Sequence, residues 1–137
     1  MNVEALRDRL LLLLADELGT YTIGKPPKTN DTPAIAIQDS GESRPNDRAI
    51  TGLEIIIRRS PERDHNSVYQ GVQRKRTWQL FLVQHQGNHT LQGAIDKMEL
   101  AFPNMRSVLL GANQQKNIRE QVSVKIVQLS EFARLRG

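Results

Sequence analysis

Hydrophobic positions recur along this chain with two periods, and these periods predict its helices and strands. From Asn2, which can cap a helix, apolar residues follow a spacing of three and four up to Leu18, and Gly19 ends the pattern. The same spacing predicts a second helix over Thr90–Phe102, which Pro103 stops. The sequence therefore predicts two amphipathic helices that each present one apolar stripe to a core.

Alternation with a period of two predicts the strands. In Leu53–Arg59 the odd positions are apolar and Glu54 lies on the opposite, polar face, although Ile56 interrupts this pattern. In Thr77–His85 both faces are apolar, which is typical of a central strand that is covered on both sides. Further strands are predicted at Ala34–Gln38, Met105–Leu110 and Gln121–Leu129.

Two connections stand out between these elements. Thr20–Pro33 is rich in Gly, Pro, Asn and Asp, and its adjacent Pro26 and Pro27 exclude a helix, so an irregular crossing is predicted there. Ser60–Gly71 separates two strands by more residues than a hairpin usually needs, which predicts a long loop. Loops of this length tend to be functional or mobile.

The order helix, three strands, helix, two strands predicts an α+β fold. We expect a mixed, mostly antiparallel sheet of four to five strands, with the two helices packed on one face. The 137 residues fit a single domain, 1–137, with a long basic loop at about 58–76. With 38% hydrophobic and 25% charged residues, the chain is neither disordered nor fibrous.

Composition also excludes several classes of site. The chain has no Cys, which rules out disulfides, zinc–thiolate sites and cysteine nucleophiles. No apolar run reaches the length of a transmembrane helix, and Glu4, Asp8 and Asp16 argue against a signal peptide. We therefore expect a protein of the cytoplasm that has no membrane partner.

The net charge of +4 is concentrated in one stretch. Residues 58–76 hold six basic side chains against two acidic ones, and antiparallel pairing of the flanking strands would bring these basic side chains to one end of the sheet. Two interpretations remain open: a solvated loop that protects a sheet edge, or a surface that contacts phosphate or an acidic partner. The basic residues are Arg58, Arg59, Arg63, Arg74, Lys75 and Arg76.

Candidate catalytic motifs fail on their context. Gly19–Lys25 matches the start of a phosphate-binding P-loop, but it follows a helix, and a proline stands where the loop needs a hydroxyl. His85 and His89 have the spacing of a helical zinc pair but flank a predicted turn. Ser40 lies in a turn without the strand-to-helix elbow of a serine nucleophile. We therefore expect no enzyme, no cofactor and no metal.

The order of elements resembles the tail-terminator proteins of long-tailed bacteriophages, of the lambda protein U type. The resemblance rests on an opening helix, a Pro/Gly-rich crossing over Gly24–Pro33, a strand pair around a long basic loop, a second helix and two closing strands. It implies a ring, expected to be a hexamer, that caps the tail tube and meets the head–neck connector protein. It also implies assembly in the host cytoplasm, a place in the virion tail or neck, and no catalytic residues.

A ring needs apolar surface for contacts between subunits, and three residues are candidates. Leu11 and Leu12 lie off the main stripe of the first helix, and Ile56 breaks the alternation of its strand. The alternative is that they fill a second layer of the monomer's own core. The basic loop would dock on an acidic partner ring or make transient contact with double-stranded DNA in the lumen. A sequence-nonspecific nucleic-acid-binding module that uses this loop is the alternative function.

Overall fold

The computed structural model describes residues 3–38, 48–58, 63–66, 72–113 and 118–130. The elements in chain order are α1 (Val3–Leu13), β1 (Thr20–Lys25), β2 (Lys28–Pro33), β3 (Ile35–Gln38), β4 (Arg48–Thr51), β5 (Leu53–Arg58), β6 (Arg63–Asn66), β7 (Val72–Gln84), α2 (Leu91–Ala101), β8 (Arg106–Asn113) and β9 (Ile118–Ser130).

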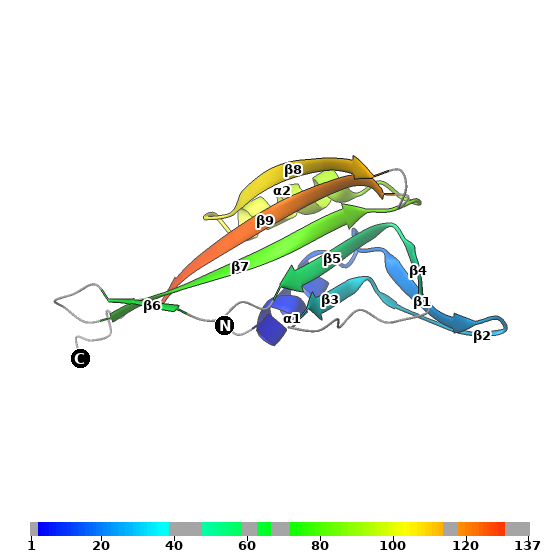
Figure 1. Ribbon diagram of the computed structural model, residues 1–137, viewed down its shortest axis with the longest axis horizontal. Coiled ribbons are helices and arrows are strands. Elements are labelled where there is room, and N and C mark those ends of the chain that lie inside the picture. Colours follow the sequence, from blue (N-terminus) through cyan, green and yellow to red (C-terminus); the bar gives the residue numbers. More distant parts are fainter. Residues whose placement is uncertain (1–2, 39–47, 59–62, 67–71, 114–117, 131–137) are drawn as a thin grey trace.

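The main sheet has the strand order β3-β5-β7-β9-β8, and β6 pairs with β7 beyond the end of β5. All of these pairs are antiparallel except β3 with β5, which is parallel. Both helices lie on the same face of this sheet, with α2 behind β8 and β9 in Figure 1. The predicted α+β class is therefore confirmed, including its mostly antiparallel sheet and its helices on one face.

The hydrophobic core fills the space between the helices and this face of the sheet. Alternate residues of the three central strands point into it, as period-two patterning requires. Four apolar residues of the first helical stripe, spaced by three and four, pack against these strand residues: Val3, Leu6, Leu10 and Leu14. The fully buried members include Leu6, Leu10, Leu14, Leu53, Ile55, Ile57, Leu80, Leu82, Met98 and Val124.

Residues 20–33 form a β-hairpin, so the prediction of an irregular crossing is wrong. Strands β1 and β2 pair antiparallel up to Lys25 and Lys28, with Pro26 and Pro27 as the two residues of the turn. The prolines exclude a helix as expected, but a two-residue turn needs no N–H donor from either of them. With β4 on the other side of β1, this hairpin makes a second sheet of three strands.

The predicted loop at 58–76 also contains strands. The backbone of β6 pairs with β7, with Arg63 opposite Lys75, and β7 begins at Val72 rather than at Thr77. An unbroken ladder from Arg74–Ser130 to Gln84–Glu120 joins β7 to β9. Backbone hydrogen bonds therefore continue the strand through a segment whose side chains gave no alternation. Figure 1 shows this hairpin and the β1–β2 hairpin at opposite ends of the molecule.

Polar contacts join α2 to α1 and to the residues that follow α1. The guanidinium of Arg9 lies 4.5 Å from the centre of the Phe102 ring and donates a hydrogen bond to the carbonyl of Ala101, at the end of α2. Lys97 forms an ion pair with Glu17 at 3.0 Å. Each helix has 11 residues, and within the described ranges no helix is long and apolar enough to cross a membrane.

Replacing Arg9 with alanine should lower the free energy of unfolding by about 1 kcal/mol. The change removes a cation–π contact and a charge beside the carbonyl end of α2, both on a partly exposed surface. Urea denaturation measures this loss. Arg9→Lys, which keeps the charge but not the planar group, should lose less. An Arg9→Ala variant that is as stable as the wild type would contradict the contact with the ring.

Candidate functional site

The predicted basic cluster lies at one end of the main sheet, where β5 ends and the β6–β7 hairpin begins. Arg58 is exposed at the end of β5. The backbones of β6 and β7 are paired, so the register brings Arg63 next to Lys75. Arg59 lies outside the described residues, as do the side chains of Arg63, Arg74, Lys75 and Arg76.

The pairing registers place three basic residues and one glutamine in a row straight across four strands. Arg58 of β5 is opposite Gln79 of β7, Gln79 is opposite Lys125 of β9, and Lys125 is opposite Arg106 of β8. Residues that are opposite one another in a sheet share a face. Arg58, Lys125 and Arg106 are exposed and Gln79 is half-buried. We call these four residues the basic row.

An apolar row runs beside the basic row on the same face. Ile56 of β5 is opposite Phe81 of β7, which is opposite Ser123 of β9, which is opposite Val108 of β8. Ile56 and Phe81 are half-buried, whereas Val108 is 61% exposed. We call Ile56, Phe81, Ser123 and Val108 the apolar row.

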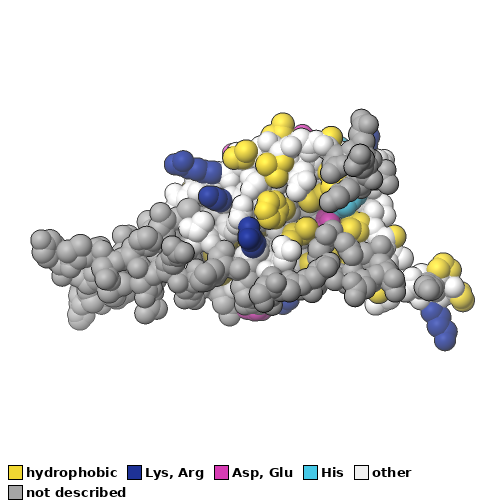
Figure 2. Space-filling model, viewed as in Figure 1, with side chains coloured by type: hydrophobic (Ala, Val, Ile, Leu, Met, Phe, Trp, Pro, Cys, Tyr) yellow, Lys and Arg dark blue, Asp and Glu magenta, His cyan; other side chains and the backbone are white. Residues whose placement is uncertain are grey.

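The two rows lie on the face of the main sheet that is turned away from the helices, here called the open face. Figure 2 shows hydrophobic side chains gathered over the middle of this face, with Lys and Arg side chains beside them. Among the described residues of β5, β7, β8 and β9, Glu54 is the one acidic side chain on this face, and it is buried. The exposed part of the open face is therefore both basic and apolar.

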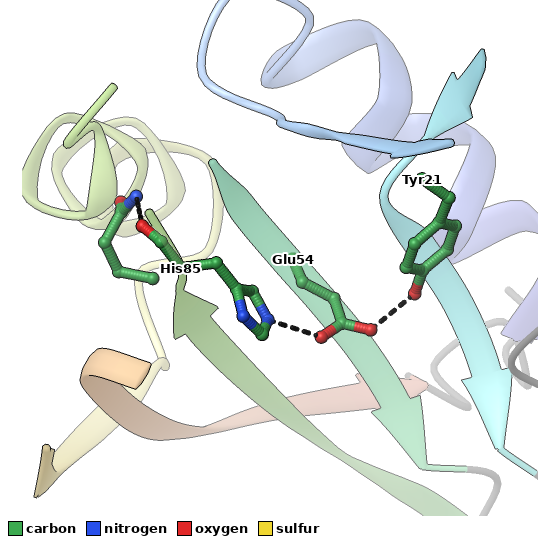
Figure 3. A network of polar contacts seen from close by, with 4 residues as sticks. Tyr21, Glu54 and His85 are labelled. Carbon is green, nitrogen blue, oxygen red and sulfur yellow. Dashed lines mark hydrogen bonds and ion pairs between the residues drawn. The ribbon is translucent and has the colours of Figure 1, made fainter. Parts of the chain in front are cut away.

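A polar network lies at the other end of the open face, where the small sheet packs against the main sheet (Figure 3). The hydroxyl of Tyr21, from β1, donates to one carboxylate oxygen of Glu54 at 2.7 Å. The Nε2 of His85, just after β7, lies 2.9 Å from the other oxygen. Glu54 is fully buried and His85 nearly so. The network thus fixes β1 to two strands of the main sheet.

The two histidines with the spacing of a zinc pair contact different carboxylates. His85 contacts Glu54, and His89 lies 3.5 Å from Glu120. Within the described ranges, no group of three or more His, Asp or Glu side chains could hold a metal ion.

The expectation that Glu54 lies on a solvent-facing strand surface is wrong, because the small sheet covers that part of the face.

The candidate residues for subunit contacts divide into two kinds. Leu12 of α1 is 84% exposed, so its apolar surface is available for a contact with another subunit, whereas Leu11 is half-buried. Ile56 belongs to the apolar row.

Sequence patterning missed Lys125 and Arg106 as partners of Arg58, because they lie in distant strands and each is an ordinary polar position of its own strand. The pairing of β7, β9 and β8 is what brings them together.

The edge of the sheet adds further exposed apolar surface. Strand β8 pairs with β9 and is the last strand of the sheet. Val108, Leu109 and Leu110 are all more than half exposed on it. On the helix side of the molecule, Leu100 of α2 is 86% exposed.

Comparison of the chain with profiles of known protein families, with curated proteins and with solved structures finds no match.

Proposed function

We propose that this protein is a structural subunit that assembles into a closed ring, and that the ring caps a phage tail tube and joins it to the head–neck connector. The observation that carries the proposal is that two different parts of the described surface, here called patches, expose large apolar side chains. One is the pair of helices, where Leu12 and Leu100 are exposed, and the other is strand β8, where Val108, Leu109 and Leu110 are exposed.

The positions of these patches favour a ring over a two-fold dimer. Large exposed apolar patches mark interaction surfaces, and an uncovered edge strand with apolar side chains is prone to pair with another chain. A two-fold dimer uses one patch twice, whereas a head-to-tail contact uses two different patches. A chain with two different patches can repeat the contact until the rotation closes. The resemblance to tail terminators supports six subunits and the placement in the virion tail or neck.

Direct imaging and molar mass test the assembly. The purified protein should form closed rings in negative-stain images, and its mass by light scattering should correspond to several subunits. Replacing Leu12 and Leu100 together with serine should shift the protein toward monomer, because this removes apolar area buried between subunits. The thermal midpoint of the separated monomer should remain within a few degrees, since both side chains are exposed in the single chain.

Leu10→Ser serves as the contrasting variant, because Leu10 is fully buried in the core and its replacement should unfold the chain rather than separate subunits. A wild-type protein that stays monomeric at high concentration, and that also fails to bind tail tubes, would overturn the ring.

The basic row favours one alternative function, that of a sequence-nonspecific nucleic-acid-binding module. Arg58, Lys125 and Arg106 could each neutralise a phosphate, so binding to DNA would weaken steeply as salt rises. A gel shift titrated with salt tests this. Binding that is unchanged after all three residues are replaced with glutamate would exclude the row as the DNA site.

A further inference from the structure

We propose that the open face of one subunit docks on the helices of the next copy of this chain. The inference rests on the proposed ring and names the two surfaces that would meet in it. The open face contributes the basic row and the apolar row. The partner surface, here called the helix layer, is the outer side of α1 and α2.

The apolar parts of the two surfaces are complementary. β7 is apolar on both of its faces, a composition typical of strands that are covered on both sides. The helices of its own chain cover only the side that holds Leu80 and Leu82. On the other side Phe81 is half-buried and Val108 is exposed. The helix layer of another copy would cover this second side of the sheet, and the contact would bury the exposed Leu100 of α2.

The charges of the two surfaces are opposite. The two helices α1 and α2 together contain four acidic and three basic side chains, which gives 3 − 4 = −1. On α2 the exposed Asp96 and Glu99 lie one helical turn apart, next to the exposed Leu100. The helix layer therefore combines apolar and acidic side chains, and the open face combines apolar and basic ones. Such complementarity fixes which faces meet and speeds their encounter.

The internal contacts of the helix layer leave this acidic surface available. Of the three basic side chains, Lys97 is engaged with Glu17, Arg7 with the neighbouring Asp8, and Arg9 with the end of α2. Asp96 accepts a hydrogen bond from the amide of Gln92 at 2.9 Å, a neutral donor that leaves its charge in place. The carboxylates of α2 can therefore face cations of another subunit.

A second copy explains the open face better than a nucleic acid does. A phosphate backbone would satisfy the three cations but would leave the exposed Val108 without an apolar partner. The helix layer offers a partner for both rows. The contact uses different surfaces on the two copies, so it is head-to-tail, as a ring requires.

A charge-swap experiment tests the pairing of these surfaces. One variant carries Arg106→Glu and Lys125→Glu, the other Asp96→Lys and Glu99→Lys, and each keeps its two like charges adjacent as in the wild type. Each variant alone should weaken assembly by about tenfold or more, measured by sedimentation velocity across a concentration series. In an equimolar mixture of the two variants, half of the possible contacts bring opposite charges together. A single chain that carries all four substitutions has opposite charges at every contact. This chain is therefore the decisive sample and should restore assembly.

Lys28→Glu and Asp31→Lys, exposed on β2 and away from both surfaces, are the matched controls and should assemble like the wild type. Rings that form equally well in all variants would overturn the face-to-helix contact while leaving the ring intact. Absence of rings in the wild type would overturn both. Loss of DNA binding in Arg106→Glu/Lys125→Glu, with assembly unchanged, would assign the open face to nucleic acid instead.

Discussion

Replacing Gly19 with alanine is expected to lower the free energy of unfolding by about 3 kcal/mol or more, a loss typical of severe overpacking. A Cβ built on Gly19 would lie 2.0 Å from the carbonyl oxygen of Thr51 and 2.7 Å from the amide nitrogen of Leu53. These are backbone atoms of the segment that enters β5, so no side chain can rotate away.

The backbone of Gly19 is also hydrogen-bonded on both sides. Its N–H donates to the carbonyl of Leu53 at 2.8 Å, and its own carbonyl accepts from the N–H of Ala34 at 3.0 Å. Moving the residue to relieve the clash would break bonds to both β5 and the start of β3. The chain after α1 therefore passes so close to the main sheet that only glycine fits.

Gly93→Ala is the matched control, because it is the same substitution in an open position. Gly93 lies in α2, and a Cβ there would reach only the Cγ of Glu17, at an ordinary 3.9 Å. Alanine favours a helix over glycine, so this variant should gain about 0.5–1 kcal/mol. Urea denaturation followed by circular dichroism measures both. Equal effects at the two glycines would show that the close approach at Gly19 is absent.

Replacing His85 with leucine is expected to cost about 3 kcal/mol, the order seen when one partner of a buried pair is removed. The imidazole lies 2.9 Å from the fully buried carboxylate of Glu54, and leucine offers that oxygen no donor. The network also ties β1 to the main sheet, so the small sheet should loosen first. Hydrogen exchange should show faster exchange in β1 than in β9.

Removing the whole network should cost less than removing the histidine alone. In the triple variant Tyr21→Phe, Glu54→Leu, His85→Leu the buried carboxyl group is gone together with the Tyr21 hydroxyl and the His85 imidazole. Buried polar networks are often neutral when apolar groups of similar size replace all members. The triple variant should therefore recover more than half of the stability that His85→Leu loses. A triple variant less stable than His85→Leu would show that the carboxylate has a stabilising role of its own.

Strong periodicity made the helices and central strands predictable. Leu6 and Leu10 of α1 and Leu80 and Leu82 of β7 are fully buried, as their spacing indicates. The end of the first helix did not follow from the stripe: α1 ends at Leu13, although the stripe continues to the half-buried Leu18. Residues beyond the helix can still contribute apolar side chains to a core, so a burial stripe alone does not mark where a helix ends.

The concentration of charge was visible in the sequence, but the candidate site was not. Arg58 stands out in a stretch of basic residues, whereas Lys125 and Arg106 are isolated cations near the other end of the chain. Only the registers of β7 with β9 and of β9 with β8 place them in one row with Arg58. In the same way, Glu54 looked solvent-facing until the small sheet was seen to cover it.

The sequence by itself determined the α+β class, the two helices and their buried stripes, and the location of the excess positive charge. These follow from local properties, namely spacing, propensity and composition. The tertiary structure alone decided the second sheet, the strands within the basic stretch, the buried network and the row across four strands. These depend on backbone pairing between residues far apart in the chain, which no local pattern of side chains encodes.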